Sequence, residues 1–343
     1  MPVTVAVDAN GADLGPAEVA AGAAEAAQRA GVRVLLFGPA AELGAPPAGV
    51  EIVDAPVSIA KAPEPAHAAR RTSDASIVQA ARAVGDGRAD ALVSGGATGA
   101  ALAAGLFHVK RAHGIYRPAL ALPLPVPGSP ILLLDVGANV IVRPEHLVQF
   151  AFMGAAFAEA VLGVRSPRVA LLSNGEEPTK GTPDLVSVHE QLAERRGPAL
   201  NFVGNVEGTS MTAGHADVVV TDGFTGNVAL KLMEGVSGAV IQAIRTRARS
   251  SVRAKAGGFL LRPALRGLRD EVDPEGSGGA YMLGLRKVGV VAHGRFTRKG
   301  FARAIEVAAR GVEARSVERT QSALEAAGAL RRPSASGSTV PHA

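Results

Sequence analysis

The chain has 343 residues, a net charge of +5 and a hydrophobic content of 47%, which favour one large α/β domain or two smaller ones. It contains no cysteine, so disulfides, thiolate metal ligands and a thiol nucleophile are excluded. Only 3% of the residues are aromatic, which disfavours a platform for stacked nucleic-acid bases.

Short apolar runs alternate along the chain with segments that favour helix. We predict strands at 3–8, 32–37, 91–94, 131–135, 168–172, 201–203 and 217–221. We predict helices at 17–30, 73–84, 99–109, 144–162, 184–194 and 226–249, and a closing helix at 299–327. This alternation is typical of a doubly wound, mostly parallel sheet. We therefore predict one α/β domain over residues 1–330, with a loop at 40–49 and a disordered tail at 331–343.

The N-terminal run and the lengths of the apolar runs indicate whether the protein is secreted or spans a membrane. The chain begins directly with the strand-like run 3–7, without the charged and apolar regions of a secretory signal. Its apolar runs are all shorter than the roughly 20 residues of a membrane-spanning helix. We expect a protein that is soluble or peripheral to a membrane.

The loop at 174–183 is the strongest local signal for function. It follows the apolar run 169–172 and places Lys180 on a glycine-flanked turn before the helix predicted at 184–194. Thr182 suits the N-cap and Pro183 the first helical turn. Free backbone N–H groups, the helix dipole and an ammonium group would meet there, as in an anion site. The alternative is an ordinary surface loop with a solvated lysine.

Six predicted strands are followed by glycine together with Asn, Asp, Ser or Thr. The segments are 8–13, 94–100, 135–139, 173–183, 204–208 and 221–227. Each alone is most often a turn. In an open α/β sheet, however, ligands bind outside the carboxyl ends of the strands. We therefore expect these segments to meet at one edge of the sheet and to line a polar cleft for phosphate or an acyl-transfer oxyanion.

Several familiar catalytic and binding signatures are missing. Residues 95–99 do not form G-x-G-x-x-G, and the sequence has no P-loop, no H-E-x-x-H and no G-x-S-x-G. His293 follows the apolar run 288–292, and for it we favour a structural role over that of a catalytic base. We expect neither a metal nor a cofactor.

Positive charge is concentrated in one window. Eight Lys and Arg residues lie between 245 and 269 without an acidic residue, so the rest of the chain is net −3. An apolar stripe accompanies a basic one in the pattern of an interfacial helix. Leu261, Leu265 and Leu268 form the apolar stripe, and Arg262, Arg266 and Arg269 form the basic one. Arg253, Phe259 and Leu260 are further candidates for contact with a membrane or carrier protein. The alternatives are a core helix with arginines facing solvent and, less favoured, nucleic-acid binding.

The motifs together resemble the bacterial phosphate acyltransferase family. The matching segments include Asp8-Ala9, Thr98-Gly99-Ala100, the block 133–151, Lys180-Gly181, Gly204-Asn205-Val206-Glu207-Gly208, Asp222-Gly223-Phe224, Gly226-Asn227, Lys231 and Ala292-His293-Gly294. Two positions depart from the family pattern, Ala12 in place of Gly and Ala97 in place of Asn.

The resemblance implies an isocitrate/isopropylmalate dehydrogenase-like fold with a protruding helical hairpin at about 226–270. It implies a cytoplasmic homodimer attached peripherally to an anionic membrane through that hairpin, and no nucleic-acid partner. The implied reaction converts an acyl carrier protein thioester and inorganic phosphate into acyl phosphate for phospholipid synthesis, with glycerol-3-phosphate acyltransferase as a further candidate partner.

For such a reaction we assign roles to the residues of the matching motifs. Phosphate is itself a nucleophile, so the protein needs to bind it, orient it and stabilise the oxyanion. We expect Lys180 and Asn227 to act in catalysis. Substrate and phosphate contacts are expected from Thr98, Gly99, Asn139, Asn205, Gly226, Lys231 and His293. Asp8, Asp222 and Glu207 are expected to orient these donors without touching phosphate.

Two rival functions stay open at this point. One is a short-chain phosphotransacylase of the same fold that uses coenzyme A thioesters. The other is a catalytically weak scaffold that binds membrane and carrier protein, and the loss of the family's Asn at Ala97 motivates it.

Overall fold

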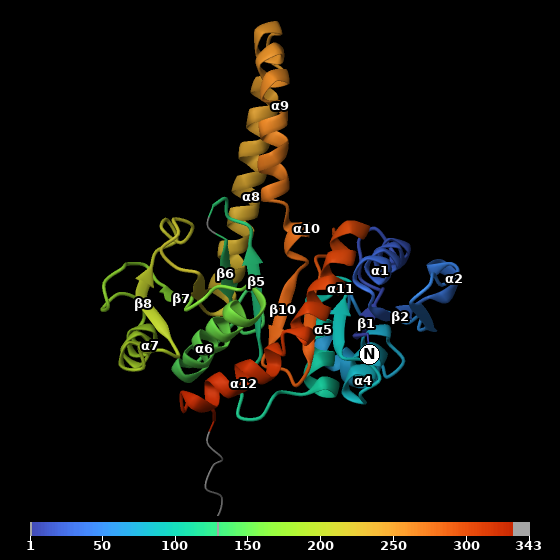
Figure 1. Cartoon of the computed structure of the whole chain (residues 1–343), viewed down its shortest axis with the longest axis horizontal. Helices are drawn as coiled ribbons and strands as arrows, with labels where there is room; N and C mark the ends of the chain where they lie inside the picture. Colours follow the sequence, from blue (N-terminus) through green and yellow to red (C-terminus); the bar gives the residue numbers. More distant parts are fainter. Residues whose placement is uncertain (1, 129, 332–343) are drawn as a thin grey trace, which may run out of the picture.

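A continuous sheet of eleven strands forms the centre of the computed structural model, which describes residues 2–128 and 130–331 (Figure 1). The strands are β1 (Thr4–Asp8), β2 (Arg33–Gly38), β3 (Val50–Asp54), β4 (Ala91–Ser94), β5 (Ala119–Leu124), β6 (Ile131–Leu134), β7 (Arg168–Leu172), β8 (Asn201–Val206), β9 (Val218–Val220), β10 (Ala280–Leu283) and β11 (Val288–Val291). The seven predicted strands are present, and β3, β5, β10 and β11 are additional.

Helices fill most of the segments between the strands. They are α1 (Pro16–Ala30), α2 (Ala40–Leu43), α3 (Pro65–Arg71), α4 (Ser76–Gly85), α5 (Thr98–Ala104), the π-helical η1 (Gly105–Val109), α6 (Pro144–Val161), α7 (Pro183–Glu194), α8 (Gly223–Ala248), α9 (Val252–Glu271), α10 (Pro274–Ser277), α11 (Arg298–Glu313) and α12 (Ser316–Ala326). The predicted loop at 40–49 contains α2. The predicted closing helix is two helices, because Arg315 adopts a left-handed conformation with φ of 52°.

Both faces of the sheet are buried, as a doubly wound fold requires. One core contains side chains of α1, α6, α7, α11 and α12, such as Phe150 and Phe301. The other contains side chains of α3, α4, α5 and η1, with Leu230 and Met233 of α8 packed against it. The buried strands are continuous apolar runs such as Ile131–Leu134, which explains why the sequence identified them.

The sheet is mostly parallel, as predicted, but three antiparallel pairings at its centre change which strand ends share an edge. The order is β3-β2-β1-β4-β11-β10-β5-β6-β9-β7-β8, and three successive antiparallel pairings join β11, β10, β5 and β6. These pairings reverse the direction of the second half of the sheet. The six segments therefore do not meet at one edge. β1, β4 and β11 end at what we call the first rim, whereas β6, β7, β8 and β9 end at the opposite, second rim.

Helices α8 and α9 project together from the body of the molecule, and we call this pair the arm (Figure 1). Every helix within residues 2–128 and 130–331 is too short or too polar to cross a membrane. Apart from Arg331, the predicted tail at 331–343 lies outside the described residues, as does the side chain of Arg269.

Candidate functional site

Asp135 organises the turn after β6 at the second rim. Its buried carboxylate accepts hydrogen bonds from the backbone N–H groups of Leu120 (2.9 Å), Ala138 (3.0 Å) and Asn139 (2.8 Å). The Asn139 amide nitrogen donates to Asp135 and to the Pro118 carbonyl, both at 2.8 Å. Burial raises the pKa of Asp135 despite these bonds. Asn139 thus has both amide hydrogens committed to the turn.

The first turn of α8 packs against the same turn. Asp222 is the N-cap of α8, accepting from the backbone N–H groups of Phe224 and Thr225, both at 2.9 Å. Gly226 lies so close to the Asp135 carbonyl that only a glycine fits there. This close approach places the Asn227 amide beside Gly137. The structure therefore places Asp222, Gly226 and Asn227 in the first turn of α8, against the turn after β6.

The Lys180 loop follows β7 at this rim, where β7 lies next to β9. Thr182 caps α7 by accepting from the Leu185 N–H at 3.3 Å, and Pro183 begins the helix, as predicted. The Lys180 N–H donates to the Glu177 carbonyl at 3.0 Å, and its side chain crosses over Gly175. Lys180 is exposed, and no carboxylate within the described residues lies within ion-pair distance. Its ammonium is available to an anion.

Asn205 on β8 fixes the position of this loop. Its amide nitrogen donates to the Glu177 carbonyl at 2.9 Å, and its amide oxygen lies 3.0 Å from His189 Nδ1 of α7. Sequence reasoning missed His189, because only the fold places α7 beside β8. Glu207 lies on the next turn, where its carboxylate accepts from the Thr209 hydroxyl at 3.3 Å.

Asp8 lies at the first rim, at the end of β1. Its buried carboxylate accepts from the Ser76 hydroxyl at 2.6 Å and from the Asn10 N–H at 3.2 Å. Burial raises the pKa of Asp8 to about 7, and the two hydrogen bonds only partly oppose this shift. Asp8 lies beneath the surface and supports the loop that follows it.

Three loops of the first rim pack against one another. Gly96 lies against the backbone of Gly294, where a Cβ atom on Gly96 would be 2.6 Å from the Gly294 backbone. The Gly294 carbonyl accepts from the Asp13 N–H at 2.8 Å. Thr98 and Gly99 are exposed in the first turn of α5. The predicted residues of these loops therefore do share one region.

His293 belongs to this first-rim group. Its Nδ1 accepts from the Arg295 N–H at 3.2 Å. Partial desolvation of the ring, followed by the positive charge of Arg295, lowers the pKa of His293, and Lys231 adds a smaller effect in the same direction. Lys231 lies on α8 one helical turn beyond Asn227 and is near enough to His293 for its charge to act on the ring.

Helix α8 connects the two rims. It begins beside Asp135 at the second rim, and three turns later Glu234 lies 3.8 Å from Arg295 at the first rim. The predicted site residues therefore form two groups. The second-rim group is Asn139, Lys180, Asn205, Glu207, Asp222, Gly226 and Asn227, and the first-rim group is Asp8, Thr98, Gly99, Lys231 and His293. Among the described residues, no three His, Asp or Glu side chains are arranged to hold a metal ion.

Comparison with known proteins identifies the family. The family described as "Fatty acid synthesis protein" matches residues 3–319. A protein from Pelotomaculum thermopropionicum named phosphate acyltransferase is 43% identical over 327 residues, which cover 94% of this chain and 95% of the relative. One of the same name from Heliobacterium modesticaldum is 44% identical over 318 residues, or 90% and 94% of the two chains. The chain belongs to the phosphate acyltransferase family.

Solved structures support the fold of this phosphate acyltransferase family member. A phosphotransacetylase from Streptococcus pyogenes has a TM-score of 0.59 at 18% identity and covers 91% of this chain and 94% of its own. The EutD phosphotransacetylase from Staphylococcus aureus has a TM-score of 0.58 at 15% identity, covering 90% and 94%. At this identity the likeness concerns the fold alone.

Proposed function

We propose that this protein transfers a fatty acyl group from an acyl carrier protein thioester to inorganic phosphate. A phosphate oxygen forms a bond to the carbonyl carbon, the carbon–sulfur bond breaks, and the departing thiolate takes up a proton to become the carrier thiol. The product is an acyl phosphate. The observation that carries the proposal is the exposed Lys180 at the N-terminus of α7, in a chain whose relatives are named phosphate acyltransferase.

Lys180 and the backbone N–H groups around it form the anion-binding part of this mechanism. An ammonium near a helix N-terminus attracts phosphate and the developing oxyanion, and phosphate needs no protein nucleophile to activate it. Asn227, with Gly226, orients phosphate or the thioester carbonyl from the first turn of α8. Asn205, Glu207 and Asp222 fix the surrounding turns.

Asn139 receives a revised role. Both hydrogens of its amide group are donated within the protein, to Asp135 and to Pro118. We therefore assign Asn139 to support of the turn after β6, in place of the substrate contact expected from the sequence.

The first-rim group provides further substrate contacts, beside the part of α8 that carries Lys231. Thr98 and Gly99 offer a hydroxyl and an exposed turn, while Lys231 and His293 offer a cation and a neutral imidazole. The buried Asp8 carboxylate accepts a hydrogen bond from Ser76, which in turn accepts one from the Asn10 amide, and these bonds stabilise the loop after β1. Ala97 offers no polar side chain here, so backbone groups of the loop carry any contact that the family's Asn would make.

We propose that the arm is the helical hairpin implied by the family resemblance, and that it attaches the protein to the cytoplasmic face of an anionic membrane. On α9, Phe259 and Leu260 have exposed fractions of 72% and 79%, and Leu261, Leu265 and Leu268 are also exposed. Each basic residue near an anionic surface, Arg253 among them, would add about 1 kcal/mol of attraction. The same charge would attract an acidic carrier protein.

We also propose a homodimer with α8 at the interface, in a single domain of the isocitrate dehydrogenase-like fold. Exposed apolar residues recur every four positions along α8, and an unpartnered stripe of this kind favours helix–helix packing. They are Phe224, Val228, Leu232, Val236, Val240 and Ile244. The acyl phosphate would then pass to an acyltransferase at the membrane, for which glycerol-3-phosphate acyltransferase is the candidate partner.

Acyl phosphate formation by the purified protein tests this proposal. We expect turnover with a long-chain acyl carrier protein thioester and inorganic phosphate, and much less with a short-chain coenzyme A thioester. The reverse preference would identify a short-chain phosphotransacylase. Absence of turnover with either thioester, from folded protein, would favour a scaffold that binds carrier and membrane.

A further inference from the structure

Residues 293–299, which we call the 293–299 loop, connect β11 with α11 at the first rim. The loop begins with His293 and Gly294, and Gly294 packs on Gly96 and accepts a hydrogen bond from Asp13. Because these contacts are backbone to backbone, a shift of the 293–299 loop displaces the glycine-rich loops after β1 and β4.

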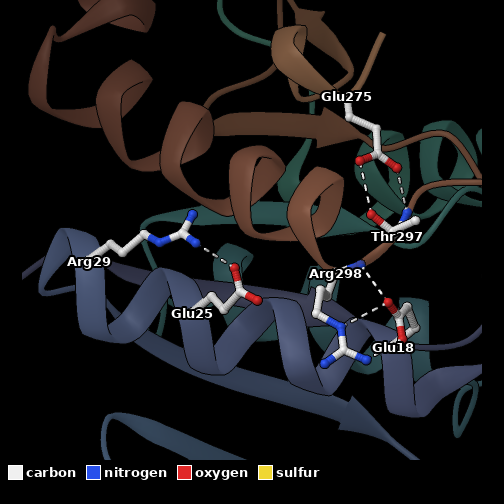
Figure 2. Close-up of polar contacts among 6 residues, drawn as sticks. All are labelled: Glu18, Glu25, Arg29, Glu275, Thr297 and Arg298. Atoms are coloured by element: carbon white, nitrogen blue, oxygen red, sulfur yellow. Dashed lines mark hydrogen bonds and ion pairs between the residues drawn. The ribbon is translucent and has the colours of Figure 1, made fainter. Parts of the chain in front are cut away.

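Helix α8 of the arm and the short segment that follows α9 both contact this loop. From α8, Glu234 lies 3.8 Å from Arg295. Just after α9, Glu275 of α10 accepts from the Thr297 N–H at 2.7 Å and from its hydroxyl at 2.9 Å (Figure 2). Lys299 Nζ lies 3.1 Å from Asp273. The loop is therefore fixed between α8 and the segment through which the chain returns from the arm to the body.

Glu275 has a counterpart that does not belong to the arm. Glu18 of α1 accepts from the N–H of Arg298 at 2.9 Å and from its Nε at 3.1 Å (Figure 2). Two carboxylates thus bind adjacent backbone N–H groups at the N-terminus of α11, where negative charge is favoured. Glu275 lies on the segment that directly follows the arm, whereas Glu18 lies on α1 in the body of the molecule.

We propose that Glu275 is a positioning residue for acyl transfer, which couples the base of the arm to the substrate-binding loops of the first rim. The inference rests on the proposed function. Glu275 acts through Thr297: it fixes the 293–299 loop, and this loop fixes the turns that carry Thr98 and Gly99. A movement of the arm then changes the position of the substrate-binding loops, in addition to the arm's proposed role in membrane attachment.

Kinetics of matched variants test the proposal. We expect Glu275→Ala to lower kcat/KM for acyl phosphate formation about tenfold, mainly through a higher KM, because misplaced binding groups cost rate. Glu275→Gln, which keeps an acceptor for the Thr297 N–H, restores most of the activity. Glu18→Ala, at the same helix terminus, stays within about twofold of wild type. Thr297→Val, which removes one donor alone, gives a smaller loss than Glu275→Ala.

Amide hydrogen exchange adds a readout that does not depend on activity. Residues 94–99 touch neither carboxylate, and we expect their exchange to accelerate in Glu275→Ala and to stay unchanged in Glu18→Ala. Wild-type kinetics and unchanged exchange in Glu275→Ala would overturn the proposal, as would equal losses in Glu18→Ala. If the wild type forms no acyl phosphate, the proposed function fails, and the exchange result still decides whether Glu275 positions these loops.

Discussion

Gly226 in the first turn of α8 lies directly against the backbone carbonyl of Asp135 at the end of β6. A Cβ atom at position 226 would overlap that oxygen. This contact fixes where α8 begins, and it places Asn227 beside Gly137 in the turn after β6. The packing of the first turn of α8 against β6 therefore requires a residue without a side chain at position 226.

Gly226→Ala should destabilise the protein by about 1–3 kcal/mol, because the added methyl forces α8 away from β6. Denaturant unfolding measures this loss. Gly235→Ala is the matched control in the same helix, since nothing lies within 4 Å of its Cβ position. It should stabilise by about 0.5–1 kcal/mol. Equal effects of the two substitutions would contradict the close packing at Gly226.

Asn205→Asp should lower kcat/KM by about tenfold with little change in fold. The substitution removes the donor to the Glu177 carbonyl and places a carboxylate oxygen beside it, which loosens the Lys180 loop. Steady-state kinetics measure the effect. Asn201→Asp is the control, because Asn201 makes a similar bond, to the Ser166 carbonyl, at the other end of β8. Its kinetics should match those of wild type.

Asp8 should make stability depend on pH. Its pKa is about 7 in the folded protein and 3.8 as a reference value, so between these values the folded state binds more protons than the unfolded state. The free energy of unfolding therefore falls as pH rises from about 4 to 7, by up to about 1.4 kcal/mol per pH unit. Asp8→Asn should flatten this slope in denaturant titrations. Parallel pH profiles of wild type and variant would rule out a buried, titrating Asp8.

The double substitution Leu260→Asp and Leu261→Asp should weaken binding to anionic vesicles, because it places charge on the exposed apolar face of α9. Co-sedimentation with phosphatidylglycerol vesicles measures this binding, and higher salt should reduce it for wild type. Acyl phosphate formation in solution should persist. Leu162→Asp, an exposed apolar residue at the end of α6, is the control. Equal vesicle binding by all three proteins would exclude the arm as the attachment site.

Local features of the site were predictable from sequence, whereas its assembly was not. The Thr182 cap, Pro183 and the exposed Lys180 follow from short-range rules that the structure obeys. The strand direction depends on β5 and β10, which are short and carry no signal of their pairing partners; β5 even contains Pro123. The partnership of Asn205 with His189 required the fold as well.

The predicted edge was wrong for the same reason. Gly-rich strand ends indicate ligand binding, yet they do not reveal which ends share a rim when antiparallel strands lie between them. The sequence predicts only part of the arm. It indicates the basic and apolar stripes of α9, but it does not indicate the contacts that Glu275 and Glu234 make near the base of the arm.

The most direct test is acyl phosphate formation by Lys180→Ala beside wild type and Lys287→Ala, an exposed lysine between β10 and β11. Removing the cation from an anion site should lower kcat/KM at least about 100-fold, while Lys287→Ala behaves as wild type. Binding of phosphate should weaken in parallel. Wild-type turnover that Lys180→Ala retains within about twofold would contradict the account of the second rim as the phosphate site.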